Sequence, residues 1–429
     1  MTARASWNQS SSVRGTEDIA QALARRRAAA AGAWDPGDAV VLVQAGDELP
    51  VPGRGDRAYP FRAHAEYLYL TDRERPGGVL AFAPGEGWVD FVAPVTAEEL
   101  LWSGLEGDRE GVPDGARPLG ELEAWLGGRP VRRLGAAAEA DDELRDALIR
   151  VRRPKDEVEL ERMRRATEAT RAGFAELAGL VAPGRTEREL QVALEAAFLR
   201  SGGDFLAFET IAAAGDHSAV LHFSPTHRAL RAGDLLLVDA GAEYRGYASD
   251  VTRTYPVGGE LDARQRLVWD TVRRAGEAAI AACAPGVEWR DVHRTAALVV
   301  ADGLIELGVL RGAPESLVES GAVTLFFPHG VGHMVGLGVR DAGAASDERR
   351  EPAPGLPKLR VDIPLAAREA WTVEPGIYFV APLLAGARGR GDVVWSRVDE
   401  LLGFGGVRIE QDVLVTDGGC EVLTAAIPL

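Results

Sequence analysis

The chain has 429 residues, of which 46% are apolar and 26% charged, a balance typical of a soluble globular protein. One hydrophobic core rarely supports this length, so we expect two domains. The formal net charge of −17 argues against nucleic acid or an anionic membrane as the main partner. The start of the sequence has no apolar signal core, no run of about 18 apolar residues follows, and two distant cysteines do not suggest a disulfide framework. We therefore expect a cytoplasmic protein.

The N-terminal third of the sequence alternates short apolar runs with helical stretches, which is an α/β pattern. Strands are predicted at residues 39–43, 78–82 and 88–92. A change from acidic to basic residues follows, and a helix is predicted to start near Asp156. We therefore divide the chain into an N-terminal α/β domain, residues 1–150, and a second domain, residues 151–429.

The second domain contains an internal repeat. Residues 182–190 and 284–292 both begin with Ala-Pro-Gly and end with an acidic and an apolar residue. Pro-Gly is typical of the end of one helix, and Thr186 with Glu189 forms a capping box that starts the next one. We therefore expect a domain of two similar halves related by a pseudo-twofold axis, with the candidate ligands between them.

Two aspartates lie in a predicted hairpin. Asp239 ends an apolar run that fits a buried strand, and Asp250 lies in a second strand rich in β-branched residues. If the turn is centred just after Tyr244, Asp239 lies directly opposite Asp250, with Cβ atoms roughly 5 Å apart. Facing like charges in an apolar hairpin are costly unless a cation lies between them, so the pair indicates a metal site. Thr252 and Thr254 share a strand face with Asp250, and they are natural hydrogen-bond donors to the side chains that bind the metal.

Three further segments supply candidate ligands. His329 and His333 lie four positions apart, but the glycines around them disfavour a helix, so one metal ion need not bind both. A buried structural histidine is the ordinary alternative for either residue. Glu374 lies at a strand end beside a Pro-Gly turn. Arg408 and Glu410 lie two apart on one strand face, where a solvated ion pair is the alternative interpretation.

Four carboxylates and one imidazole suit two divalent ions, of which Mn²⁺, Co²⁺ and Zn²⁺ are the candidates, and exclude a thiolate-dominated site. Two such ions about 3.5–4 Å apart lower the pKa of a water between them and stabilise the oxyanion that its attack produces. The sequence has no Gly-x-Ser-x-Gly motif, P-loop or dinucleotide fingerprint, so a serine nucleophile or a nucleotide cofactor has no support.

These segments resemble the prolidase and aminopeptidase P metallopeptidases, which have the pita-bread fold. The matching motifs lie at residues 239–254, 328–333, 372–376 and 406–410. The stretch that follows Gly376 is most similar to bacterial Xaa-Pro dipeptidases. Residues 58–62 and 67–71 instead resemble the creatinase-like N-terminal domain of aminopeptidase P.

The resemblance implies a role for each candidate ligand. Asp239 would bind one metal ion, and Asp250 and Glu410 would bridge both. His333 and Glu374 would complete the shell of the other ion. Glu374 would also pass the proton of the bridging water to the leaving amine.

The resemblance also implies groups that act on the substrate, which we expect to be a short peptide. His222 would contact the scissile carbonyl, and His329 would stabilise the tetrahedral intermediate. We also expect Arg408 and Tyr378 to bind substrate. A homodimer is the assembly that the family implies.

The sequence departs from the family at two positions. Seven residues after the ligand histidine, the family normally has a second substrate-binding histidine, and this chain has Arg340. One interpretation is an ion pair with Asp341 or another acid. The other is that the guanidinium binds a substrate carboxylate through two charge-assisted hydrogen bonds, a contact worth roughly 1.5–3 kcal/mol. The smaller departure is Arg368, where a glycine usually precedes the strand of Glu374.

Our main hypothesis from the sequence is a dinuclear metallopeptidase that cleaves dipeptides or short peptides at the C-terminal side. It would act as a dipeptidase or carboxypeptidase with relaxed demand for proline, and Arg340 would anchor the free C-terminal carboxylate. The alternative is a strict Xaa-Pro dipeptidase or Xaa-Pro aminopeptidase. A metal-free creatinase-like hydrolase and an inactive binding module are further alternatives, but five intact ligand positions argue against both.

Overall fold

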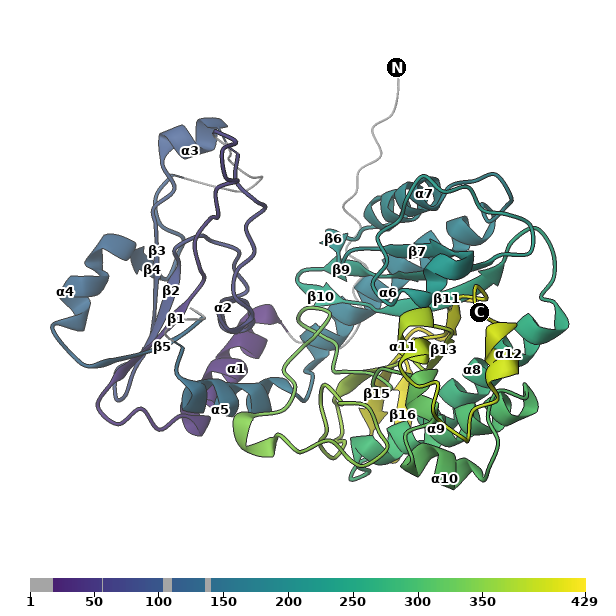
Figure 1. The fold of residues 1–429 in the computed structure, drawn as a ribbon. Helices are drawn as coiled ribbons and strands as arrows, with labels where there is room; N and C mark the ends of the chain where they lie inside the picture. Colours follow the sequence, from purple (N-terminus) through teal and green to yellow (C-terminus); the bar gives the residue numbers. More distant parts are fainter. Residues whose placement is uncertain (1–17, 56, 103–109, 136–139) are drawn as a thin grey trace, which may run out of the picture.

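The structure is a computed structural model of the chain, and it describes residues 18–55, 57–102, 110–135 and 140–429. An N-terminal unit lies beside a larger C-terminal unit (Figure 1). The N-terminal unit is built on a mixed sheet with the strand order β4-β3-β2-β1-β5. Its strands are β1 Val40–Gln44, β2 Val79–Ala83, β3 Gly87–Val92, β4 Ala116–Pro118 and β5 Val131–Leu134. The three predicted strands are therefore confirmed to within one residue.

Helices cover both faces of this sheet. Those towards the C-terminal unit are α1 Ile19–Ala33, α2 Ala65–Thr71 and α5 Asp142–Arg152. The opposite face packs against α4, Leu122–Leu126, and the remaining helix, α3, spans Ala97–Trp102. The predicted α/β class of the unit is confirmed.

The segment 153–156, between helices α5 and α6, joins the two units. Helix α6, Glu157–Ala178, begins after Asp156, which forms a capping box with Glu159, so the predicted helix start is correct. The boundary predicted near residue 150 falls in the last turn of α5.

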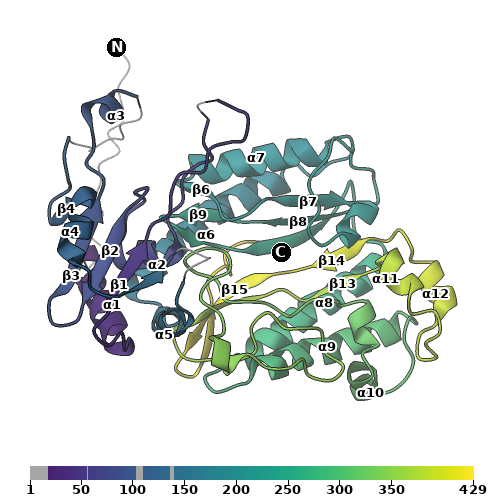
Figure 2. The same cartoon turned by 60° about the vertical axis from the view of Figure 1, so that its left-hand side comes forward.

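The C-terminal unit repeats one arrangement twice (Figure 2). In the first half, α6 and α7 precede the antiparallel sheet β11-β8-β7, and in the second half, α8 and α9 precede the antiparallel sheet β12-β15-β16. The bounds are α7 Glu187–Arg200, β7 Ile211–Ala214, β8 Leu235–Ala240, β11 Val251–Pro256, α8 Ala263–Ala282, α9 Trp289–Glu306, β12 Ala370–Val373, β15 Gln411–Thr416 and β16 Gly419–Val422. Helices lie outside and strands face each other in the middle, so the predicted duplication is confirmed.

Smaller elements complete this unit. They are β6 Phe205–Leu206, the 3₁₀ turn η2 Gly215–Ala219, β9 Ala242–Tyr244, β10 Tyr247–Ala248, α10 Pro314–Glu319, β13 Gly376–Tyr378, α11 Ala381–Ala385, α12 Trp395–Asp399 and β14 Gly406–Arg408. The short sheet β13-β14 lies between the two halves. In the part of the chain that the structure describes, no helix is both long and apolar enough to cross a membrane.

The predicted register of the aspartate hairpin is wrong by two residues. Tyr244 pairs with Tyr247 and Asp239 pairs with Thr252, so Asp239 is not opposite Asp250. The turn is centred one residue later than predicted, because Arg245 and Gly246 both have positive φ, 52° and 85°. Two positive φ values at the centre of a two-residue turn match the twist of the strands around it.

The two units share one hydrophobic cluster. It joins side chains of α1, α2 and α5 to α6, β10 and the segment that precedes β12, with Tyr67, Leu148, Met163, Tyr247 and Val335 among its buried members. Ion pairs follow the same boundary, including Arg26 with Asp156 and Arg162 with Asp72. The N-terminal unit therefore packs against the elements that carry the candidate ligands.

The two cysteines, distant in sequence, meet in the second half. Cys283 caps the end of α8, and Cys420 lies in β16. Their thiols donate hydrogen bonds of 3.3 Å to the carbonyls of Ala279 and Ile280, which are consecutive residues of the last turn of α8. Cysteine spacing gave no indication of this contact.

Candidate metal centre and active site

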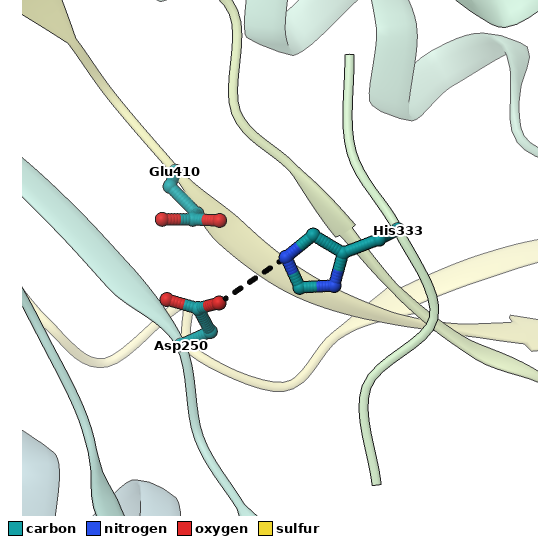
Figure 3. Close-up of side chains that lie close together, drawn as sticks. All are labelled: Asp250, His333 and Glu410. Atoms are coloured by element: carbon teal, nitrogen blue, oxygen red, sulfur yellow. Dashed lines mark ion pairs between the residues drawn. The ribbon is translucent and has the colours of Figure 1, made fainter. Parts of the chain in front are cut away.

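Three buried side chains from separate elements converge between the two halves (Figure 3). Asp250 lies between β10 and β11, His333 on the irregular segment before β12, and Glu410 between β14 and β15. One ligand atom from each lies within 4.8 Å of the other two. His333 Nε2 is 3.5 Å from Asp250 Oδ2 and 3.9 Å from Glu374 Oε1. The structure therefore brings four of the five predicted ligands together.

Asp239, the fifth predicted ligand, is held by Arg408. This guanidinium donates from Nη2 to Asp239 Oδ2 at 2.6 Å, from Nη1 to the Tyr378 hydroxyl at 2.8 Å and from Nε to Thr252 Oγ1 at 3.1 Å. Asp239 Oδ1 is buried, and none of the described residues donates a hydrogen bond to it. One oxygen of Asp239 is thus fixed by Arg408, and the other remains an acceptor for a cation.

The sequence around His333 fixes the orientation of its ring. A Cβ at Gly332 would lie 2.0 Å from the Thr372 carbonyl oxygen, so only glycine allows this close approach to β12. Two hydrogen bonds join His333 to Thr372, one between backbones at 2.8 Å and one to the hydroxyl at 3.1 Å. The ring Nδ1 contacts the Met334 carbonyl at 3.1 Å, which leaves the Nε2 lone pair for the acidic cluster.

The electrostatics of the cluster favour a divalent cation. Burial raises the pKa of Asp250 well above its ordinary value, and the nearby carboxylates of Asp239 and Glu374 add to this. Burial likewise raises the pKa of Glu410, together with the charge of Asp250. Burial also raises the pKa of Glu374, although His333 opposes it. Buried like charges of this kind are stabilised by metal ions, and oxygen donors with one imidazole fit Mn²⁺, Co²⁺ or Zn²⁺.

Two polar groups orient these ligands. Thr252 donates a 2.8 Å hydrogen bond to Glu410 Oε2, as predicted for a ligand partner, whereas the Thr254 hydroxyl donates to the Arg408 carbonyl and not to a ligand. Asp412 was missed by the sequence analysis. It accepts hydrogen bonds from the Asp250 backbone and from Ser249, and burial raises its pKa to about 7. The alternation that placed Arg408 and Glu410 on one strand face would have included Asp412.

The cluster lines a cavity of about 1330 Å³, whose lining also includes His222, His329 and Arg340. His222 lies on the turn after η2 and lines the same cavity as His329 and His333. Partial burial lowers the pKa of His222, and the charges of Arg340 and Arg408 lower it further. A neutral His222 at pH 7 keeps one ring N–H as a hydrogen-bond donor.

His329 and Tyr378 form a hydrogen-bonded pair. His329 Nδ1 contacts the Gly330 carbonyl at 2.8 Å, and Nε2 contacts the Tyr378 hydroxyl at 2.9 Å. Burial lowers the pKa of His329 to about 3, assisted by Arg408. Both ring nitrogens therefore have protein partners, and the predicted contact with a reaction intermediate requires that one of these bonds be exchanged.

Arg340 lies on the cavity wall with no described carboxylate within ion-pair distance. The ion pair with Asp341 that the sequence allowed does not form. Asp341 instead accepts hydrogen bonds from Lys155 Nζ at 2.6 Å and from Arg152 Nη2 at 2.7 Å. Arg368, the second departure from the family, has a φ of 69°, a left-handed value that explains why glycine is usual there.

The buried donor set between two similar halves fits a metal-dependent hydrolase, and comparisons with known proteins identify the family. The model of metallopeptidase family M24 matches residues 161–417, and that of the aminopeptidase P N-terminal domain matches residues 23–116. The chain belongs to metallopeptidase family M24. The expected enzyme class, the pita-bread fold and the use of a divalent metal cofactor are thereby confirmed.

Relatives match the chain along nearly its whole length. It is 34% identical to Xaa-Pro aminopeptidase 1 of Streptomyces coelicolor, over 96% of this chain and 86% of the relative. It is 31% identical to the probable Xaa-Pro aminopeptidase PEPP of Paracoccidioides lutzii, over 94% and 93%. Among solved structures, Pseudomonas aeruginosa aminopeptidase PepP is 30% identical to this chain with a TM-score of 0.79. That match covers 95% of each chain. Escherichia coli aminopeptidase P with the inhibitor Pro-Leu is 27% identical with a TM-score of 0.81, and covers 96% of both chains.

Proposed function

We propose that this metallopeptidase is an Xaa-Pro aminopeptidase that uses two divalent ions to release the first residue of a peptide whose second residue is proline. The similarity to Xaa-Pro aminopeptidases, which includes the N-terminal unit and not only the catalytic half, carries this proposal. It favours the alternative that the sequence left open over the main hypothesis of cleavage at the C-terminal side.

The ligands proposed for the ions are Asp239, Asp250, His333, Glu374 and Glu410. The buried and unbonded Oδ1 of Asp239 and the raised pKa values of Asp250 and Glu410 support this set. When bound, the ions polarise the scissile carbonyl and activate water for its attack. Arg408 contributes by holding Asp239 and Tyr378 in place.

The remaining polar groups would bind the substrate and carry its proton. Glu374 has 19% of its side chain exposed and lines the cavity, so it could pass a proton to the nitrogen of the departing proline. His222, with its lowered pKa, would donate its ring N–H to the scissile carbonyl oxygen as negative charge develops there.

Product analysis on a small peptide panel tests the proposal. Metal-loaded protein should release alanine from Ala-Pro-Ala and from Ala-Pro-Gly-Gly, and should cleave Ala-Ala-Ala at least about 10-fold more slowly. Cleavage of the dipeptide Ala-Pro, but of neither longer Ala-Pro peptide, would instead indicate an Xaa-Pro dipeptidase. Release of C-terminal residues from the longer peptide would overturn the aminopeptidase assignment.

Arg340 supports a second candidate function, a peptidase that anchors the free C-terminal carboxylate of its substrate. The observation in its favour is a guanidinium on the cavity wall without an acidic partner among the described residues. A carboxylate anchor predicts that C-terminal amidation slows cleavage about 10- to 150-fold. Arg340→Met should abolish that difference, whereas Lys358→Met, a cation removed from the same cavity lining, should retain it. Equal rates for acid and amide in the wild type would exclude this candidate.

A further inference from the structure

We propose that Glu187, a buried residue outside the cavity lining, is a positioning residue that holds the loop of His222 in its catalytic shape. This inference rests on the proposed function, because it assumes that His222 contacts the substrate. Glu187 is the first residue of α7 and is fully buried. A buried carboxylate is costly unless its oxygens accept hydrogen bonds, so its partners indicate what it holds.

Among the described residues, those that bond to the Glu187 carboxylate all belong to the segment 214–226. Oε1 accepts from the Ala214 backbone at 2.9 Å and contacts His217 Nδ1 at 2.8 Å. Oε2 accepts from the Thr226 backbone at 3.1 Å and from the Thr226 hydroxyl at 2.7 Å. One oxygen thus binds the start of the loop and the other binds its end. His222 lies between these two attachment points.

A contact between two rings links Glu187 to Phe223, the residue that follows His222. His217, held by Glu187, stacks on Phe223 with ring centroids 4.2 Å apart and planes at 29°. Phe223 and Leu221, which flank His222, pack against a buried cluster that contains Tyr378. The direction in which His222 leaves the backbone therefore depends on contacts that Glu187 organises.

The loop is also fixed to the strand that leads to Arg408. Ser218 accepts a 2.8 Å hydrogen bond from the Gly406 backbone in β14 and donates one of 2.6 Å to the Gly215 carbonyl. With Ser218 still attached to β14, loss of the contacts with Glu187 would let the rest of the loop shift and displace His222. Misplacement of a catalytic group by about 1 Å can lower a rate about 100-fold.

Glu187→Gln is the direct test, because it keeps the size of the side chain but replaces one acceptor oxygen with an NH₂ donor. That NH₂ would face the backbone N–H of Ala214 or of Thr226, a donor that it cannot accept from. We expect kcat to fall about 10- to 100-fold, KM to change by less than about 3-fold and metal content to remain unchanged. Glu189→Gln is the matched control, because Glu189 is exposed and caps the same helix without touching the loop.

A double-mutant cycle separates positioning from general stability. In a His222→Ala background, Glu187→Gln should have no further effect on kcat, because the group that it positions is gone. If kcat falls by the same factor in both backgrounds, Glu187 is only structural and the proposal is overturned. Thr226→Val, which removes a single donor, serves if Glu187→Gln does not fold, and it should show a smaller loss with the same dependence on His222.

A measurement without catalysis keeps this inference separate from the proposed function. Amide hydrogen exchange over residues 214–226 should become at least about 10-fold faster in Glu187→Gln and should not change in Glu189→Gln. If the metal-loaded wild type cleaves no Xaa-Pro peptide, the proposed function fails, and the cycle can use the peptide that it does cleave. Unchanged exchange in Glu187→Gln would overturn the positioning role whatever the substrate.

Discussion

Lys155→Met should destabilise the protein strongly, although Lys155 lies outside the cavity. The ammonium is fully buried and donates to Asp341 Oδ2 at 2.6 Å and to the Arg152 carbonyl at 2.7 Å. Methionine fills nearly the same volume but leaves the Asp341 carboxylate with one cation in place of two. The substitution therefore removes one of the two cations that neutralise a buried carboxylate, without opening a cavity.

The expected loss can be bounded from these contacts. Removal of one partner of a buried ion pair costs about 3–5 kcal/mol, because the other charge stays buried and uncompensated. Arg152 still donates to Asp341 Oδ1 at 2.7 Å, which places the expected loss near the lower end, about 3 kcal/mol. Since Asp341 directly follows Arg340 on the cavity wall, we also expect a measurable change in KM.

Chemical denaturation measures this loss. Lys358→Met is the matched control, because Lys358 is the only other lysine of the chain and is exposed. It should change the free energy of unfolding by less than about 0.5 kcal/mol. The double variant Lys155→Met with Asp341→Asn should lose less stability than the sum of the losses of the two single variants. If Lys155→Met costs no more than Lys358→Met, or if the two substitutions are additive, the pair is not the strong coupling that its geometry indicates.

The remaining predictions concern the metal, the pH and the thiols. Chelation should abolish peptidase activity, and Mn²⁺, Co²⁺ or Zn²⁺ should restore it, as measured by rate and metal content. Thr252→Val should weaken metal binding about 10- to 100-fold in a metal titration, because Glu410 loses its orienting hydrogen bond. Burial raises the pKa of Asp341, but Lys155 and Arg152 outweigh this effect and hold that pKa below its ordinary value of 3.8. The stability that this carboxylate contributes should therefore be complete above about pH 4 and should be lost as the pH falls further. A small-molecule disulfide should link Cys283 and Cys420 with loss of both free thiols, and Cys420→Ser should prevent the link.

The convergence of the candidate ligands could be predicted because each motif combines a reactive side chain with local backbone constraints. Strands, turns and glycines around Asp250, His333 and Glu410 are all local features, and the structure brings these residues together. The register of the hairpin was wrong because Arg245 takes a left-handed conformation that asparagine or glycine normally takes. The Gly246 that follows it was the available indication that the turn lies one residue later.

Contacts between distant segments could not be predicted from one sequence. The pairing of Lys155 with Asp341 joins residues 186 positions apart, and the contact of Cys283 with Cys420 depends on how α8 meets β16. Glu187 looks like an ordinary acidic residue in the first turn of a helix, and only its burial against a later loop distinguishes it. Such roles depend on tertiary packing, which strand and helix periodicity does not encode.

The hydrophobic cluster shared by the two units has a consequence for how the protein melts. Side chains of α1, α2 and α5 pack on Met163, Tyr247 and Val335, and Val335 lies two residues from His333. A fragment without the N-terminal unit would expose this apolar surface and lose packing close in sequence to one candidate metal ligand. Heating should therefore give one cooperative calorimetric transition in which bound metal is released as the N-terminal sheet unfolds. The boundary visible in the sequence separates two folds, but we expect the two units to unfold together as one cooperative unit.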